Sequence, residues 1–169
     1  VRLMYVANPN NPTGTFIDAV TMEGFLARVP PDVAVVLDEA YNEYLPPEDR
    51  FDSTAWVRRF PNLLVSRTFS KAYGLAGLRL GFGVMPQWLA DAVRRARPPF
   101  TVNSVAEAAG IAALEDDAFY SETLNLVFKG RDQFLAELPA LGCRVWPSQA
   151  NFVMFSPPKD AGHVCEELL

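Results

Sequence analysis

The chain of 169 residues is poor in the residue types on which several enzyme classes depend. Its one histidine, His163, is the single candidate base for a Ser-His-Asp or Cys-His mechanism and stands in a plain helical stretch. Its two cysteines, Cys143 and Cys165, cannot make a disulfide framework, and their apolar surroundings are typical of buried thiols in a reducing cytoplasm. We therefore expect a cytoplasmic protein without a metal site, whose general base is another residue type.

Positive charge and long apolar runs are also scarce. Lysine and arginine number 15 against 20 acidic residues, and the net charge is -5. The short arginine clusters are typical of solvated faces rather than of a nucleic-acid footprint. No apolar run approaches the roughly 20 residues that span a bilayer, and residues 1–6 lack the layout of a signal peptide. We predict neither nucleic-acid binding nor membrane insertion.

Half of the residues are hydrophobic, a balance typical of globular proteins, and short apolar runs alternate with amphipathic segments. Strands are expected at residues 1–7, 34–37, 62–70 and 78–85. Helices are expected at residues 18–29, 88–96 and 103–115. This order predicts an α/β fold with a mostly parallel sheet covered on both faces, whose ligands bind beyond the carboxyl ends of the strands.

The pattern changes near residue 116. A long amphipathic helix is expected at 118–141, then strands at 143–146 and 151–155 and a helix from Ala161. We predict two domains, with the C-terminal part of a large α/β domain in residues 1–115 and the start of a small α+β domain in residues 116–169. The chain opens with a central-looking strand and closes inside a helix, which indicates a fragment.

Polar residues follow the apolar strands at the edge where ligands are expected. Asn11, Asp38 and Ser70-Lys71 fall there, and Tyr41, Thr68 and Arg79 stand close to them in the sequence. This set offers a partner to each group of a cofactor with an aldehyde, a pyridine nitrogen, a phenolic oxygen and a phosphate. Lys71 is the only lysine at this edge and can form a Schiff base, while Asp38 can keep a pyridine nitrogen protonated, which makes the ring an electron sink.

The remaining members suit the other two groups of such a cofactor. Asn11 and Tyr41 are suitable donors to a phenolic oxygen. A phosphate needs a bidentate cation and hydroxyls, which Arg79, Thr68 and Ser70 can provide.

Each residue alone also has an ordinary structural explanation. An aspartate after an apolar strand is often a helix cap, so for Asp38 alone the structural explanation is favoured. Arg79, between two leucines, could equally be a structural ion-pair residue. A nucleotide-binding fold also places ligands at strand ends, but the chain lacks its glycine motifs. The joint order of the residues favours the cofactor site.

Three segments carry a specific resemblance: N-N-P-T-G at 10–14, D-E-A-Y-N-E-Y at 38–44 and R-T-F-S-K-A-Y-G-L-A-G-L-R-L-G at 67–81, with A-N-F at 150–152 as a weaker one. Together they resemble the class I and II aminotransferases of fold type I, which use pyridoxal 5'-phosphate (PLP). Within that family they are most similar to the histidinol-phosphate aminotransferases. The resemblance covers essentially the whole chain and implies the PLP-dependent transferase fold and a homodimer.

The resemblance also implies roles for the residues of the set. Lys71 is the Schiff-base lysine and proton shuttle, Asp38 is the partner of the ring nitrogen, and Tyr41 acts with Asn11 on the phenolic oxygen. Arg79, Ser70 and Thr68 hold the phosphate. The implied reaction, a step of histidine biosynthesis, moves an amino group from glutamate to imidazole-acetol phosphate, giving 2-oxoglutarate and histidinol phosphate.

Alternatives remain open. Relatives with the same lysine motif act on aromatic amino acids or decarboxylate threonine phosphate. Family members are roughly twice this length, and four of their parts have no counterpart here: the N-terminal arm, the upstream phosphate-binding loop, the aromatic residue stacked on the ring and the arginine that binds the substrate carboxylate. We therefore expect weak or no turnover from the chain alone, and an inactive truncated domain is the non-enzymatic alternative.

Overall fold

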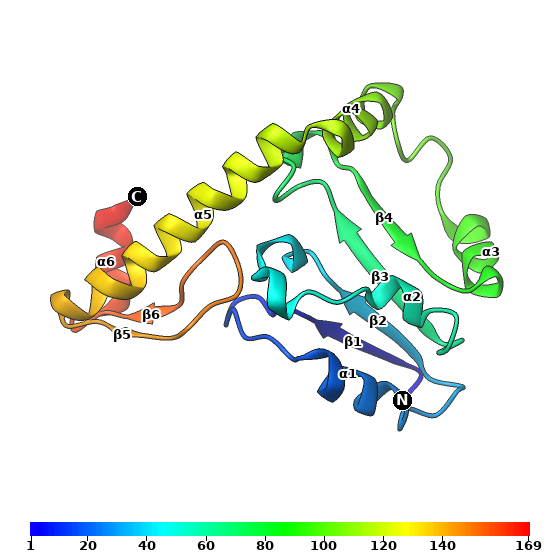
Figure 1. Cartoon of the computed structure of the whole chain (residues 1–169), viewed down its shortest axis with the longest axis horizontal. Coiled ribbons are helices and arrows are strands. Elements are labelled where there is room, and N and C mark those ends of the chain that lie inside the picture. The colour runs from blue at the N-terminus through cyan, green and yellow to red at the C-terminus, as the bar shows by residue number, and fades with distance from the viewer.

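The computed structural model describes residues 1–169 and contains a four-stranded sheet, a two-stranded sheet and the helices around them (Figure 1). The strands are β1 (Leu3–Ala7), β2 (Ala34–Asp38), β3 (Leu63–Thr68), β4 (Gly81–Val84), β5 (Arg144–Val145) and β6 (Phe155–Ser156). The α-helices are α1 (Ala19–Leu26), α2 (Ser53–Trp56), α3 (Gln87–Ala96), α4 (Ser104–Glu115), α5 (Asp117–Glu137) and α6 (Ala161–Leu168). Short 3-10 helices are η1 (Asn42–Tyr44), η2 (Pro47–Asp49), η3 (Ala76–Leu78) and η4 (Leu138–Leu141).

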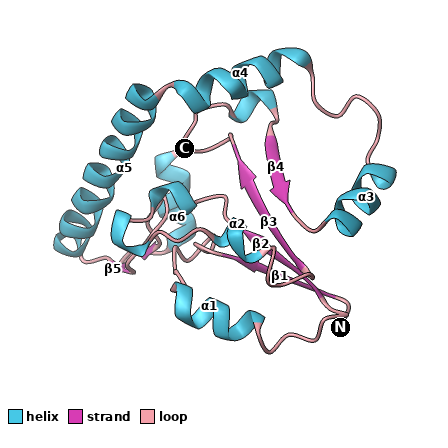
Figure 2. Ribbon diagram, turned by 45° about the vertical axis from the view of Figure 1, so that its right-hand side comes forward, coloured by secondary structure: helices cyan, strands magenta, loops and turns pink.

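The main sheet has the order β1-β2-β3-β4, and its first three strands are parallel. The register pairs Ala7 with Asp38 and Asp38 with Ser66, so β1 and β2 end side by side and β3 passes them by two residues. Strand β4 runs antiparallel to β3, as Figure 2 shows. A parallel neighbour usually needs an α-helix in its crossover, whereas the connection at residues 69–80 contains only a turn and η3. The mostly parallel α/β sheet is confirmed.

One face of this sheet is buried under α1 and α2. The buried side chains of this aliphatic core are Met22, Leu26, Val35, Leu37, Leu63 and Val65. The other face is not covered, since Leu3 and Tyr5 are 57% and 63% exposed. The expected cover on both faces is therefore wrong for this chain, because the helix α5 that follows packs on η1 and α4 instead.

A second buried cluster, the aromatic core, lies between η1, the start of the turn after β3 and α5. Its buried members are Tyr41, Tyr44, Ala72, Leu124 and Ala150. Phe152 joins it with its ring edge-on to Tyr41, at 5.3 Å between centroids. Helix α5 then runs away from the main sheet toward β5, β6 and α6 (Figures 1 and 2). Segments far apart in the sequence therefore meet beside the ends of β2 and β3.

Several expected elements differ in extent. The α-helix expected at 118–141 ends at Glu137 and continues as η4, because Pro139 has no N–H to donate. The strand expected at 151–155 is wrong except at its last residue, since only Phe155 and Ser156 pair with β5. Residues just before it bond elsewhere: the Gln149 amide donates to the Gly14 carbonyl oxygen at 2.7 Å.

Two further observations concern the cysteines and the helices. Cys143 is half-buried and Cys165 is exposed, so the expected burial of the second thiol is wrong. Cys165 lies on α6, a short helix that is exposed along most of its length. None of the helices is both long and apolar enough to cross a membrane.

Candidate active site

A cavity of about 280 Å³ lies at the carboxyl ends of β1 and β2. The residues that line it are Tyr5, Ala7, Pro9, Asn11, Asp38, Ala40 and Tyr41. These residues lie together because β1 and β2 are parallel and end at the same edge of the sheet. The residues that follow both strands therefore border the same cavity. Three residues of the predicted site, Asn11, Asp38 and Tyr41, therefore line one cavity.

Tyr41 joins two other members of the predicted set. The Asn11 side-chain amide donates to the Tyr41 phenol oxygen at 2.8 Å. The Lys71 ammonium nitrogen lies 5.3 Å from the centroid of the Tyr41 ring. Tyr41 is buried, so this phenol is fixed in place, whereas Lys71 is exposed and its amine is accessible. An amide, a phenol and an amine from three different loops are thus brought together.

Asp38 accepts hydrogen bonds on both carboxylate oxygens. Its Oδ1 accepts from the Ala40 amide at 3.1 Å and from the Ser66 hydroxyl at 3.3 Å, and its Oδ2 accepts from the Tyr5 hydroxyl. This last bond, with burial and the negative charge of Asp38 adding to it, raises the pKa of Tyr5 to about 12. Tyr5 therefore stays a donor at neutral pH, and three donors orient the carboxylate.

The turn after β3 carries the other predicted residues. The Ser70 amide donates to the Thr68 hydroxyl oxygen at 3.0 Å, so Thr68, Ser70 and Lys71 belong to one turn. The β3–β4 register pairs Thr68 with Gly81, which puts Arg79 beside the end of β3. Its guanidinium, however, donates to the Ala76 carbonyl oxygen at 2.7 Å and is exposed. The Arg79 side chain is thus not joined to Thr68 or Ser70.

The loop that carries Asn11 is anchored at both ends. The buried Asn8 side chain donates to the Ile17 carbonyl oxygen at 2.9 Å and accepts from the Ile17 amide at 2.7 Å. Gly14 adopts a left-handed φ of 69°, and a Cβ there would meet Ser148 atoms at less than 3 Å. Only glycine therefore allows residues 147–149 to pack on this loop.

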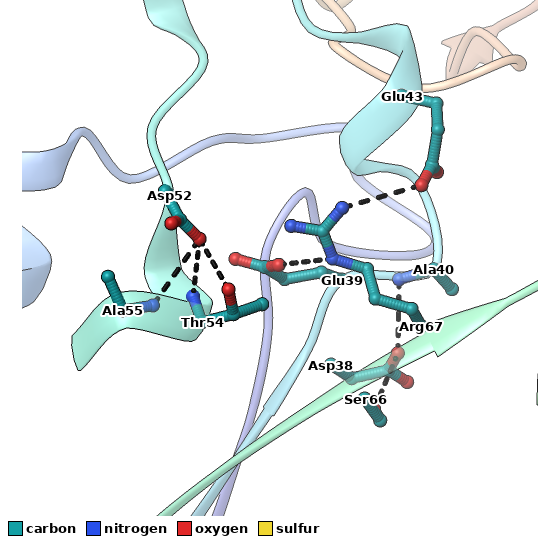
Figure 3. A network of polar contacts seen from close by, with 9 residues as sticks. All are labelled: Asp38, Glu39, Ala40, Glu43, Asp52, Thr54, Ala55, Ser66 and Arg67. Atoms are coloured by element: carbon teal, nitrogen blue, oxygen red, sulfur yellow. Dashed lines mark hydrogen bonds and ion pairs between the residues drawn. The ribbon is translucent and has the colours of Figure 1, made fainter. Parts of the chain in front are cut away.

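The sequence did not identify Tyr5 and Ser66 as partners of Asp38, nor a buried group of charges next to the site. This charged cluster is made by Glu39, Glu43 and Arg67 (Figure 3). The signal for Tyr5 is the alternation of β1: residues two apart share a face, and Tyr5 precedes Ala7, the pairing partner of Asp38, by two. The sequence feature that could have indicated the charged cluster is the pair of glutamates, Glu39 and Glu43, inside the 38–44 motif.

The arrangement fits PLP. The carboxylate of Asp38 and the Asn11–Tyr41 pair border the same cavity, which suits a ring with a basic nitrogen and a phenolic oxygen. The Lys71 amine lies close to the ring of Tyr41, which lines this cavity, so the amine is near enough to form a Schiff base with the aldehyde of a cofactor bound there. Thr68 and Ser70, which precede the lysine in the same turn, carry hydroxyls that suit a phosphate.

Comparison with known proteins shows which family the chain resembles. Residues 1–169 match the family model described as aminotransferase class I and II. The chain is 56% identical over 160 residues to histidinol-phosphate aminotransferase 2 of Ralstonia nicotianae, a match that covers 95% of this chain and 43% of that protein.

Solved structures are similar as well. Histidinol-phosphate aminotransferase from Sinorhizobium meliloti in complex with pyridoxal-5'-phosphate has a TM-score of 0.89 and 34% identity, over 98% of this chain and 45% of that chain. L-threonine-O-3-phosphate decarboxylase from Porphyromonas gingivalis has a TM-score of 0.83 and 27% identity, over 95% of this chain and 49% of that chain.

The chain spans less than half the length of the curated relatives it matches. Its match to the family model nevertheless runs from the first residue to the last, and the similar structures confirm the predicted fold. The chain belongs to the class I and II aminotransferase family.

Proposed function

We propose that the protein of which this chain is part is a PLP-dependent aminotransferase that uses the couples glutamate/2-oxoglutarate and histidinol phosphate/imidazole-acetol phosphate. The observation that carries the proposal is the meeting of Asn11, Tyr41 and Lys71 beside the cavity that Asp38 borders. The identity of 56% to a histidinol-phosphate aminotransferase supports this substrate pair.

Bound PLP supplies a ring that withdraws the electron pair released at the substrate α-carbon. Lys71 holds the cofactor through its ε-amine. With this amine free, Lys71 would take the proton from the substrate α-carbon and would return it during the transfer of the amino group. Its exposed position above the Tyr41 ring leaves room for this movement.

Two groups keep the ring in the state that this chemistry needs. The Asp38 carboxylate, oriented by Tyr5, Ser66 and the Ala40 amide, holds a proton on the ring nitrogen. The Tyr41 phenol and the Asn11 amide donate to the phenolic oxygen, and their mutual bond of 2.8 Å fixes their spacing.

We assign the phosphate to Thr68, Ser70 and Arg79. The two hydroxyls already lie in the Lys71 turn. Arg79 stands beside the end of β3 and has to exchange its bond to the Ala76 carbonyl for one to the phosphate. We further propose a cytoplasmic homodimer in which residues 1–115 belong to a large domain and residues 116–169 to a small one.

A second candidate function is decarboxylation of threonine phosphate, because such an enzyme has a TM-score of 0.83 to this chain. Its identity of 27% is about half of the value for the aminotransferase relative, so we place it second. A third, transfer from aromatic amino acids, has no observation in its favour here.

Half-reactions of the full-length protein test the choice. The protein is loaded with PLP and mixed separately with glutamate, histidinol phosphate, phenylalanine and threonine phosphate. We expect the visible absorption band of lysine-bound PLP to be lost with glutamate and histidinol phosphate, without release of carbon dioxide. Carbon dioxide release from threonine phosphate, or a band that never forms, would contradict the proposal.

A further inference from the structure

The charged cluster of Glu39, Glu43 and Arg67 is buried next to the site, and its side chains form ion pairs with one another rather than with the residues to which we assign PLP (Figure 3). The Arg67 Nε lies 2.6 Å from a Glu39 carboxylate oxygen, and one of its terminal nitrogens lies 3.5 Å from a Glu43 oxygen. The three side chains are only 17%, 0% and 7% exposed, in the order Arg67, Glu39, Glu43. Burial of ions costs free energy, and only well-placed counterions and hydrogen bonds offset this cost.

The cluster stands where the pairing of β2 with β3 ends. The strand register ends at Asp38 and Ser66, and the Glu39 amide adds one last bond to the Ser66 carbonyl oxygen at 3.0 Å. Beyond it, β2 leads through Tyr41 into η1, while β3 turns toward β4 and leads into the Lys71 turn. The strands therefore separate just before the residues that must stay aligned.

The Lys71 turn packs into the aromatic core through the buried Ala72, but its backbone hydrogen bonds stay within the turn or on the β4 side. The Gly74 amide donates to the Lys71 carbonyl oxygen and the Leu75 amide to the Phe69 carbonyl oxygen, both inside the turn. The Phe69 amide donates to the Leu80 carbonyl oxygen, on the β4 side. None of these bonds reaches β2 or η1. Ser66 bonds to Asp38 and Lys71 lies over the Tyr41 ring, but Arg67 is the side chain that forms ion pairs across the separation, with Glu39 and Glu43.

Each partner in the cluster is close in sequence to a site residue. Glu39 directly follows Asp38, Glu43 comes two residues after Tyr41, and Arg67 comes four residues before Lys71. A guanidinium suits the task because its planar fork can hold two carboxylates at fixed angles, which an ammonium cannot do.

We propose that Arg67 is a positioning residue: by binding Glu39 and Glu43 at once, it sets the distance of the Lys71 turn from Asp38 and Tyr41. The inference rests on the proposed function, because it gives Lys71 a cofactor to reach. It does not make Arg67 a catalytic residue, since the guanidinium contacts the two glutamates and not the cavity.

The experiment uses the full-length protein without cofactor. In Arg67→Met, we expect amide hydrogen exchange to accelerate about tenfold or more in residues 68–75 and 39–44, while residues 1–26 stay within twofold of the wild type. Arg67→Lys is expected to recover part of this protection. Arg59→Met is the matched control, since Arg59 forms an exposed ion pair with Glu23.

Removing Arg67 alone leaves two buried carboxylates without their cation, which can unfold the protein. The triple variant Arg67→Met, Glu39→Gln and Glu43→Gln removes that charge. We expect the thermal midpoint of the triple variant to return toward the wild-type value. The amide exchange of residues 68–75 should remain fast. The affinity of this variant for PLP, titrated by the visible band, should be about tenfold weaker than that of the wild type. If exchange and affinity recover together with the midpoint, Arg67 is only structural and the inference is wrong.

The two proposals fail separately. A wild type that forms no visible band with PLP contradicts the proposed function, and the exchange measurement still decides whether Arg67 holds the turn. A wild type that forms the band, with an Arg67→Met variant whose 68–75 exchange and PLP affinity are unchanged, contradicts the positioning role alone.

Discussion

Strands β2 and β3 each change character within one or two residues. Leu37 and Val65 are fully buried in the aliphatic core, whereas their neighbours at the carboxyl end, Glu39 and Arg67, are buried as an ion pair. The two regions are two residues apart along the same two segments of chain, and both are largely buried. They differ in what burial does to the free energy.

Burial of an aliphatic side chain stabilises the fold by about 1.5–3 kcal/mol without requiring a specific partner. Burial of an ion costs several kcal/mol, which only a well-placed counterion offsets. The aliphatic core therefore supplies most of the stability of the fold, which should persist when side chains at the strand ends are displaced. The polar ends depend on individual partners, so the two regions should respond differently to substitution.

Leu37→Ala is expected to have the largest effect on stability. Leu37 is fully buried between α1 and the sheet, so the free energy of unfolding should fall by about 2–5 kcal/mol, measured by urea denaturation. The folded fraction should still bind PLP, because the site is built by other residues. Leu126→Ala, at a side chain exposed on α5, is the control and should change little. Equal losses in both variants would contradict the distinction.

Asp38→Ala should have the reverse effect. The partner of the ring nitrogen is lost, so turnover of the full-length protein should fall roughly 10²- to 10³-fold, while some PLP remains attached to Lys71. Asp38 is only half-buried, so the unfolding free energy should change little. Asp91→Ala, at an aspartate paired with Arg94 on α3, is the control. Comparable turnover in the Asp38 variant would refute the assigned role.

Tyr5→Phe should have a smaller effect on the same carboxylate. It removes the hydroxyl that donates to Asp38 but leaves the donors Ser66 and Ala40, so the loss should be about 1 kcal/mol, or roughly fivefold in turnover. Steady-state kinetics checks it, with Tyr120→Phe on α5 as the control. A loss as large as in Asp38→Ala would mean that Tyr5 itself acts on the cofactor.

The smallest expected effect is the contribution of Glu39 and Glu43 to the pH dependence of the unfolding free energy. Burial raises the pKa of Glu39 and of Glu43, and Arg67 opposes this effect in both. The folded state therefore keeps protons that the unfolded chain releases. This contribution is complete below the unfolded pKa of about 4.3, and it is lost as pH rises through the raised folded values.

Urea denaturation at several pH values tests this sign. In Glu43→Gln, the decline of unfolding free energy with rising pH should be shallower than in the wild type, whereas Glu23→Gln, at an exposed glutamate, should keep the wild-type slope. The comparison of variants is needed because Asp52, whose pKa is lowered chiefly by the Thr54 hydroxyl, contributes a slope of the opposite sign. A steeper decline in Glu43→Gln would contradict the account.

The sequence predicted the parts that depend on local pattern. Apolar runs such as 34–37 marked the buried strands, and the polar residues after them marked the edge where Asn11, Asp38 and Tyr41 meet. The antiparallel direction of β4 was not predicted, because an apolar run is the same for both directions. The end of the long helix was misplaced because the break at Pro139 was not taken into account.

Contacts between distant elements were the part that the sequence did not reveal. Tyr5 looked like one more apolar strand residue until the register placed it beside Asp38. Arg67 and Glu43 are far apart in sequence, and nothing local distinguishes their buried pair from solvated charges. Arg79 was predicted beside the phosphate, but its guanidinium lies on the Ala76 carbonyl, and its role stays a prediction.

The central claim is that Lys71 carries the cofactor. The most direct measurement is reduction of the PLP-loaded full-length protein with borohydride, followed by digestion and mass analysis of the labelled peptide. We predict a single phosphopyridoxyl group on Lys71, none on Lys129 or Lys159, and no label in this segment after Lys71→Ala. Label on another lysine, or label at an unchanged level in the Lys71→Ala variant, would contradict the account.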